Sequence, residues 1–166
     1  MGYVINDLHD LVEVSVASRA HRPHNQERRF TVVFNPSQLD KDLRAREFAL
    51  FCHLALELRH VTVVVEELRF VTTPSYAPEA WSMLTMTGRD IDIHVIGTSQ
   101  RPASIDKDFL GNCTTISSGR LEYLEDRIVT AKSLQIDPRE LETLVDLEYW
   151  ERTTGQVPKK GRISWK

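Results

Sequence analysis

The sequence predicts an α/β domain with a mainly parallel β-sheet, helices on both faces and a C-terminal β-hairpin. Short apolar runs alternate with segments whose apolar residues recur at helical spacing, the order expected of βαβ units. These runs are nearly continuous in apolar residues, as in parallel strands that are buried on both faces. Near the C-terminus, two further runs flank a Gly/Pro/Lys turn, which is typical of a hairpin.

Length and composition indicate one globular domain of 166 residues, with 41% hydrophobic and 27% charged residues. A net charge of −3 gives no whole-chain attraction to nucleic acid or membranes. The two cysteines form no CxxC pair, and the six histidines lack metal-ligand spacing with them, so we expect reduced thiols in an intracellular protein. We identify no signal peptide and no apolar run long enough to span a bilayer, so no membrane partner is expected.

The first 28 residues carry conflicting patterns. Asn6 could cap a helix over residues 7–11, whereas residues 12–16 alternate with a period of two and favour a strand. A helix followed by a strand, or either one alone, fits this segment. Residues 21–29 are polar and include a proline, so we expect a loop there.

Strands and helices then alternate along the chain. Asn35-Pro36 ends one strand, Gly88 ends a helix, and Asp137 before Pro138 is an N-cap followed by a first-turn proline. The predicted strands cover residues 30–34, 61–65, 91–98 and 113–117, and two more form the tail over 149–165. The predicted helices cover residues 43–58, 79–87, 121–131 and 138–147, with a turn or short helix over 103–110.

Two adjacent carboxylates, Glu66 and Glu67, follow the predicted strand over residues 61–65. Open α/β sheets place their chemistry at the carboxyl ends of the strands, so these acids are candidate functional residues. The next strand is preceded by Gly88-Arg89, and it ends in Thr98-Ser99-Gln100 and Arg101-Pro102.

This order of features resembles the second half of a P-loop ATPase core of the FtsK/HerA superfamily. That superfamily includes DNA translocases, viral genome-packaging ATPases and the phage Zot-like proteins. Residues 88–113, GRDIDIHVIGTSQRPASIDKDFLGNC, carry most of the resemblance. In the family an Arg precedes the strand, a polar Gln ends it, and Arg-Pro follows. The resemblance implies a single ATPase-like domain over 1–166, with a divergent segment (1–28), a family-like core (29–151) and a hairpin (152–166).

The resemblance also implies roles for four residues. Glu66 stands where the Walker B acid holds Mg²⁺ and its water shell, and Glu67 where an acid orients the attacking water. Gln100 resembles the sensor that hydrogen-bonds the γ-phosphate or the water. Arg89 resembles an arginine offered to the nucleotide of a neighbouring subunit, and Arg101 is the less favoured finger. ATP and Mg²⁺ are the cofactors that these roles require.

Each of these residues also has a simpler interpretation. The glutamates could be solvated strand-end residues, Gln100 could cap a turn, and Arg89 could be a surface charge. His94 lies on a predicted buried strand and is interpreted as a hydrogen-bonded core histidine. A basic loop is interpreted as solvated, with nucleic-acid contact as the alternative; it contains Arg19, His21, Arg22, His24, Arg28 and Arg29.

The sequence departs from the family in two ways. None of its seven glycines fits the phosphate loop G-x-x-x-x-G-K-[ST], and the nearest candidate, GQVPKKGRIS at 155–164, has the wrong spacing and lies in a predicted hairpin. Glu66 stands where the family has Asp, which changes the reach to Mg²⁺. The chain is therefore a fragment, or a natural protein that lost nucleotide binding and whose residues 12–16 could fill the missing strand.

The sequence thus predicts an FtsK/HerA-like ATPase-family domain of a phage or mobile element. It would act in DNA packaging, translocation or virion morphogenesis, as a homo-oligomer or as a partner subunit, in the bacterial cytoplasm or with the virion. Whether it is an enzyme stays open: if active, it hydrolyses ATP. The alternative is an inactive relative with a structural or protein-interaction role, and a third reading is a DNA-binding module that uses the basic loop.

Overall fold

The computed structural model describes residues 2–5, 31–36 and 38–164. The chain divides into two units, residues 1–64 with 78–96 and residues 65–77 with 97–166. The alternatives for residues 7–16, and the basic loop over 19–29, lie outside the described residues.

In the first unit, strand β1 (Gly2–Ile5) pairs in parallel with β2 (Thr31–Phe34). Helix α2 (Lys41–Leu58) follows, and Asp40 caps it because its Oδ1 accepts the N–H groups of Asp42 at 3.0 Å and Leu43 at 2.9 Å. The strand and the helix predicted for this part of the chain are therefore confirmed.

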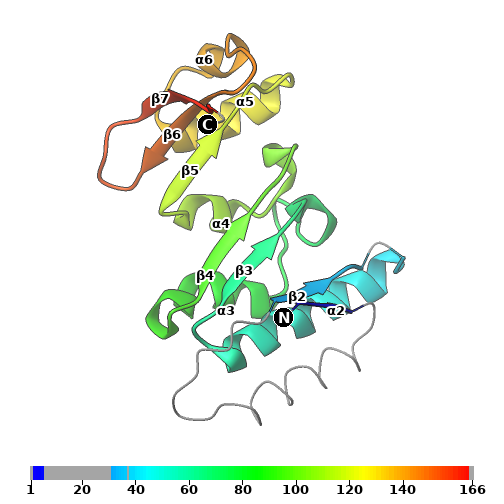
Figure 1. Cartoon of the computed structure of the whole chain (residues 1–166). Coiled ribbons are helices and arrows are strands. Elements are labelled where there is room, and N and C mark those ends of the chain that lie inside the picture. Colours follow the sequence, from blue (N-terminus) through cyan, green and yellow to red (C-terminus); the bar gives the residue numbers. More distant parts are fainter. Residues whose placement is uncertain (1, 6–30, 37, 165–166) are drawn as a thin grey trace. The chain divides into compact units, whose positions relative to one another are not determined.

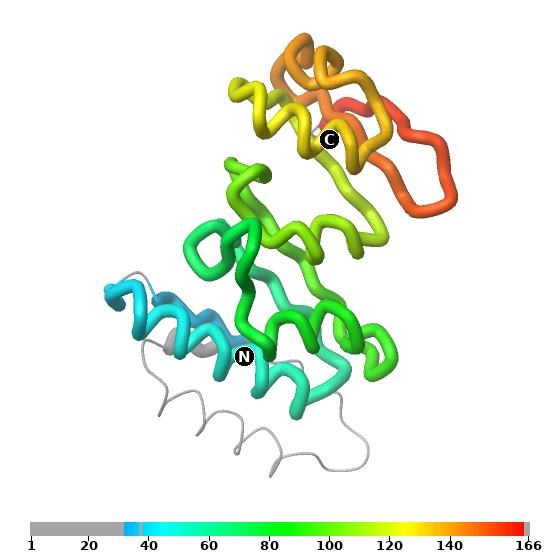
Figure 2. The backbone as a smooth tube through the Cα atoms, turned by 180° about the vertical axis from the view of Figure 1, so that it is seen from behind, coloured from blue at the N-terminus to red at the C-terminus, as the bar shows by residue number. Residues whose placement is uncertain are grey.

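Helix α3 (Glu79–Thr87) has the predicted bounds and packs beside α2, as Figure 2 shows from behind. The rings of Phe48 on α2 and Trp81 on α3 lie 5.4 Å apart between centroids. Trp81 and Cys52 are completely buried, so the two helices share the core of this unit.

Strands β3 (Thr62–Val65) and β4 (His94–Gly97) are neighbours, and the division between the units falls within both of them. The N–H of His94 donates to Val61 O and the N–H of Thr98 to Val65 O, each at 3.0 Å. Both bonds have the same residue offset, so the strands run in parallel, as the arrows in Figure 1 show.

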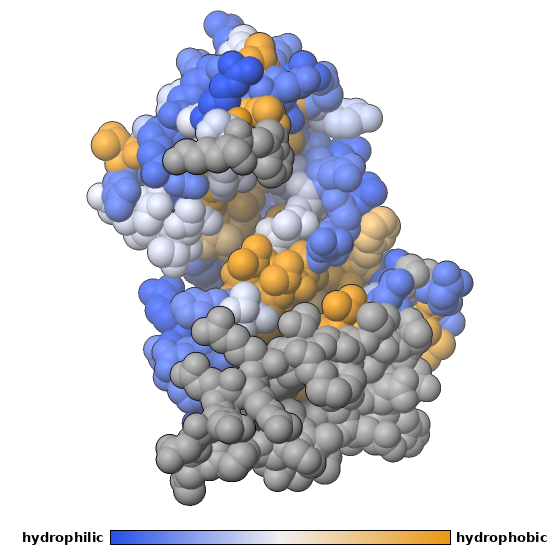
Figure 3. Space-filling view, in the orientation of Figure 1, coloured by the Kyte–Doolittle hydropathy of each residue, from blue (hydrophilic) through white to orange (hydrophobic). Residues whose placement is uncertain are grey.

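The parallel part of the sheet is smaller and less enclosed than the sequence predicts. Val63 and Val65 are buried, whereas Val64 is 54% and Ile96 is 50% exposed, so only one face of β3 is covered. Figure 3 shows apolar residues at the surface over the part of the molecule that holds these strands. His94 is exposed, so its interpretation as a core histidine is wrong.

Strand β4 begins later than predicted, at His94, because the preceding residues turn. Gly88–Ile91 form the 3₁₀ helix η2, Asp92 has a left-handed backbone with φ of 56°, and the N–H of Ile93 donates to Gly88 O at 2.9 Å. A turn of this kind interrupts the extended run that the apolar pattern suggested.

The second unit contains an antiparallel sheet in the order β5-β6-β7. Strand β5 (Thr115–Ser118) pairs with β6 (Glu148–Thr153), and β6 forms the predicted hairpin with β7 (Lys159–Arg162). Because β5 joins the hairpin, the prediction of one mainly parallel sheet is wrong for this part of the chain.

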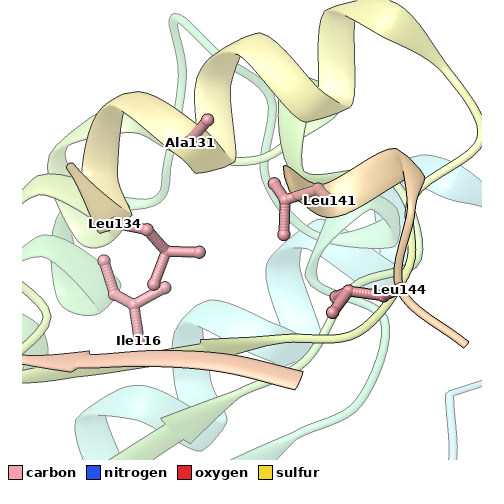
Figure 4. Close-up of a cluster of buried hydrophobic side chains, with 5 residues drawn as sticks. All are labelled: Ile116, Ala131, Leu134, Leu141 and Leu144. Atoms are coloured by element: carbon pink, nitrogen blue, oxygen red, sulfur yellow. The ribbon is translucent and has the colours of Figure 1, made fainter. Parts of the chain in front are cut away.

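Helices α5 (Leu124–Leu134) and α6 (Pro138–Glu142) pack together in this unit. Asp137 caps α6 as predicted, accepting the Arg139 N–H at 2.8 Å. Helix α6 ends before the predicted residue 147 because Glu148 closes a turn: its N–H donates to Val145 O and its Oε2 accepts the Val145 N–H. A cluster of buried side chains, drawn in Figure 4, joins these elements: Ile116, Ala131, Leu134, Leu141 and Leu144.

Replacing Leu134 by Ala should destabilise the second unit by about 2–5 kcal/mol, because the buried side chain leaves a cavity. Ile128 lies on the same helix but is 50% exposed, so Ile128→Ala is the matched control and should cost far less. Urea unfolding of both variants measures the difference. Equal losses of stability would contradict this assignment of the core.

Both cysteines are free; Cys52 is buried in the first unit and Cys113 is partly buried in the second. Burial raises the pKa of the Cys52 thiol to about 12 and that of Cys113 to about 11. Both should therefore react slowly with thiol reagents at pH 8 and rapidly in urea. Labelling rates of Cys52→Ala and Cys113→Ala would then report the opening of each unit separately. Fast labelling of folded Cys52 would show that its burial is incomplete.

Candidate functional site

The carboxyl ends of β3 and β4 bring two of the predicted residues together. Strand β3 is followed by Glu66 and Glu67, and β4 by Thr98, Ser99 and Gln100. Because the two strands are parallel neighbours, both sets of residues leave the sheet at the same edge.

Glu67 is tied to the end of β4 through its backbone. It has a left-handed conformation, with φ of 53° and ψ of 63°, which costs a non-glycine residue about 1–3 kcal/mol. Its N–H donates to Thr98 Oγ1 at 3.4 Å, and the next N–H, of Leu68, donates to Thr98 O at 3.0 Å. The short 3₁₀ helix η1 (Leu68–Phe70) then begins. These contacts maintain a conformation that Glu67 would otherwise avoid.

The carboxylate of Glu67 makes two contacts. Its Oε1 accepts the backbone N–H of Gln100 at 3.1 Å, and its Oε2 lies 3.2 Å from Arg69 Nε. Glu67 and Gln100 are therefore in contact, but through the backbone of Gln100, whose residue is exposed. This contact did not follow from the sequence, which predicted a role for the Gln100 side chain.

The other two predicted residues are both exposed. Glu66 lies at the end of β3 in the second unit, and Arg89 lies in η2 of the first unit. The exposed carboxylate of Glu66 fits a solvated strand end and also a ligand of a hydrated cation. Its role as an Mg²⁺ ligand, and that of Arg89 as a finger, stay predictions.

Arg101 makes contacts within its own unit, which the sequence did not predict. Its Nε lies 2.7 Å from Oδ2 of Asp126 on α5, and its guanidinium stacks 4.1 Å from the centroid of the Tyr123 ring. Asp126 is only 1% exposed, and its Oδ1 accepts the N–H of Ala103 at 2.8 Å. One pattern in the sequence could have indicated that Asp126 is buried. It lies four and eight residues before Thr130 and Leu134, so all three share one face of α5, and all three are buried.

The lysines of the glycine-containing segment 155–164 are engaged in the hairpin. Lys159 Nζ lies 3.0 Å from Glu151 Oε1, and Lys160 Nζ lies 2.8 Å from Glu148 Oε2. The hydrogen bond from Lys160 lowers the pKa of Glu148, and the bond to Glu151 raises the pKa of Lys159. This segment is thus the turn and second strand of a hairpin, as predicted, and not a strand-to-helix phosphate loop.

Two further searches cover only the described part of the chain. No group of three or more His, Cys, Asp or Glu side chains there could hold a metal ion. Proteins commonly bind Mg²⁺ with one or two carboxylates together with waters and substrate phosphates, which is the kind of site predicted for Glu66. Within the same residues, no helix has the length and apolar character needed to cross a membrane.

The chain is similar to solved structures of a viral protein. For the genome packaging NTPase B204 from Sulfolobus turreted icosahedral virus 2 in complex with AMPPCP, the TM-score is 0.67 at 10% identity, covering 100% of this chain and 98% of that chain. The complex of the same NTPase with ATP-gammaS gives 0.65 at 11% identity, covering 99% and 97%. B204, the DNA-packaging ATPase from Sulfolobus turreted icosahedral virus, gives 0.63 at 13% identity, covering 98% and 82%.

No protein-family model matches the chain, and no curated protein matches it either. The likeness to the B204 structures shows the fold alone: an α/β domain similar to that of these viral NTPases, in which the parallel core is only partly formed among the described residues. The resemblance found in the sequence agrees with this fold. The identity to the B204 sequences, 10–13%, does not establish the family.

Replacing Gly97 by Ala should disturb the end of β4 that carries the site. A Cβ atom on Gly97 would lie 2.5 Å from Leu68 Cδ1 and 2.8 Å from the Phe109 ring, so the variant should lose about 1–3 kcal/mol. Gly111 has no atom within 4 Å of such a Cβ, which makes Gly111→Ala the matched control. Thermal unfolding compares the two variants. A Gly97→Ala protein as stable as the control would refute this close packing.

Proposed function

We propose that this chain is an FtsK/HerA-like ATPase-family domain that serves the packaging or translocation of viral or mobile-element DNA. The observation that carries the proposal is the contact between Glu67 and the Gln100 backbone, at the carboxyl edge of β3 and β4. It occurs in a chain whose fold matches that of a genome packaging NTPase over nearly the whole length of both proteins. By analogy with the DNA-packaging ATPase B204, DNA is a proposed partner, and further copies of the chain are proposed because Arg89 would act on a neighbouring subunit.

In this function the carboxylates have distinct roles. Glu67 orients the attacking water, because the Thr98 hydroxyl holds its backbone N–H and the Gln100 backbone N–H holds its carboxylate. Glu66 holds the water shell of Mg²⁺ from the end of β3, and that ion would neutralise charge on the phosphates. The Gln100 side chain, which is exposed, contacts the γ-phosphate or the water, and Arg89 acts on the nucleotide of a neighbouring subunit.

The phosphates of a nucleotide need a cradle that the described residues do not contain. The sequence has no phosphate loop, and the glycine-containing segment 155–164 forms a hairpin. We therefore propose that a second polypeptide supplies these contacts. Without them the carboxylates would repel the nucleotide.

The second candidate function is that of an inactive relative with a structural or protein-interaction role. The absence of a phosphate loop favours it. So does the Glu67 carboxylate, since the Gln100 N–H donates to one of its oxygens and the other lies in an ion pair, 3.2 Å from Arg69 Nε. In this function the chain would occupy a place in a packaging assembly without turning over ATP.

Calorimetric titration of the purified chain with Mg²⁺-ATP separates the two functions. The active function predicts binding, and Glu67→Gln should then lower the rate of hydrolysis about 100-fold or more with little change in affinity. Glu140→Gln changes an exposed carboxylate on α6 and is the matched control. A Glu67→Gln protein that hydrolyses ATP like the parent would refute the role of Glu67.

Absence of ATP binding by a folded chain would favour the inactive function. Analytical ultracentrifugation would then show whether the chain associates with itself. The structural role predicts a defined oligomer that binds no nucleotide. If the chain is a monomer that binds no nucleotide, the structural role would require a complex with a partner protein.

A further inference from the structure

Residues 100–103, which follow β4, make hydrogen bonds to Glu67 at one end and to Asp126 at the other. At the start of this segment, the N–H of Gln100 donates to Glu67 Oε1 at 3.1 Å. Immediately after, the chain turns: the Arg101 N–H donates to Ser99 Oγ at 3.0 Å, and Pro102–Ser104 form the 3₁₀ helix η3. The direction of the Gln100 N–H therefore depends on what holds residues 101–103.

Asp126 holds these residues from α5. Its Oδ2 pairs with Arg101 Nε at 2.7 Å, and its Oδ1 accepts the Ala103 N–H at 2.8 Å, so one carboxylate bridges both ends of the short segment. The carboxylate is almost completely buried, whereas Arg101 is about one-third exposed and lies over the ring of Tyr123. Such charge-assisted bonds are short and directional, and removing one partner leaves the other charge uncompensated.

A buried acid in this position has a cost that apolar packing would avoid. Thr130 and Leu134 continue the same buried stripe of α5, and an apolar residue at position 126 would extend their packing. The two polar contacts described for Asp126 both go to the segment just after the candidate sensor. This placement points to control of the segment, not to filling of the core.

We propose that Asp126 is a positioning residue: through Arg101 and Ala103 it orients the segment after β4 so that the Gln100 N–H holds the Glu67 carboxylate. Tyr123 supports the arrangement by confining the Arg101 guanidinium. The positioning is a property of the folded chain without ligands, and its meaning for catalysis rests on the proposed ATPase function.

The test measures amide hydrogen exchange by NMR in the chain without nucleotide. Asp126→Asn keeps the shape and one acceptor but removes the charge, and Arg101→Gln removes the other partner. In each variant the Gln100 amide should exchange about tenfold faster, while the amides of β5 change by less than about twofold. Glu67→Gln shows the effect of weakening the Gln100 bond directly, and Asp137→Asn is the matched control, an acid that caps α6 away from this segment.

The double variant Asp126→Asn with Arg101→Gln gives the sharper readout. If the two residues act through one contact, their effects on Gln100 exchange are not additive, and the double variant exchanges no faster than either single one. Tyr123→Leu leaves the buried carboxylate intact and should accelerate Gln100 exchange by a smaller factor. It also provides a measurement if the Asp126 variants fail to fold.

Unchanged Gln100 exchange in the folded variants would overturn the proposal. So would acceleration of Gln100 and the β5 amides by the same factor, because that pattern indicates general destabilisation. If the chain hydrolyses ATP, Asp126→Asn should lower kcat with nucleotide affinity unchanged. If it does not, the active function fails, while the exchange result still decides whether Asp126 positions Gln100.

Discussion

Three polar groups of Thr98 hold the candidate site together. Its N–H continues the parallel ladder by donating to Val65 O, its carbonyl accepts the Leu68 N–H, and its Oγ1 accepts the Glu67 N–H. Thr98 thus provides hydrogen-bond partners for the Val65 carbonyl and for the N–H groups of Glu67 and Leu68, where the chain turns away from the sheet. The turn, the left-handed backbone of Glu67 and the contact with Gln100 all depend on this register.

The site is also constrained by packing and by a buried charge. On the packed side, Leu68 and Phe109 approach Gly97 so closely that a Cβ atom there would displace their side chains. Beyond the strand, Asp126 fixes residues 101–103 from α5. The Glu67 conformation, which is unfavourable by itself, lies between these two constraints. Strain of this kind persists only where surrounding structure determines it, and it is common at functional sites.

Local patterns predicted the individual elements well and their assembly less well. The bounds of α3 follow from Pro78 and Gly88, and the cap of α6 from Asp137, because these signals act within one turn. The partner of β5 could not be predicted, since an apolar run of this length fits a parallel or an antiparallel neighbour. Contacts such as Gln100 to Glu67 and Arg101 to Asp126 join residues far apart in sequence, and no periodicity reports them.

The charges at this edge of the sheet limit what the chain can do alone. Glu66 and Glu67 are both acidic, and the arginines that follow them and Gln100 in the sequence are already paired, Arg69 with Glu67 and Arg101 with Asp126. A nucleoside triphosphate that approaches these residues meets carboxylates. The guanidinium groups of Arg69 and Arg101 are already in ion pairs with other carboxylates. Phosphoryl transfer depends mainly on positioning and charge neutralisation, so the proposed ATPase function needs positive charge beyond these two arginines, and Mg²⁺ would supply part of it. In the proposed function, the end of β3 and β4 supplies the carboxylate that orients water, and the contacts that hold the phosphates come from elsewhere.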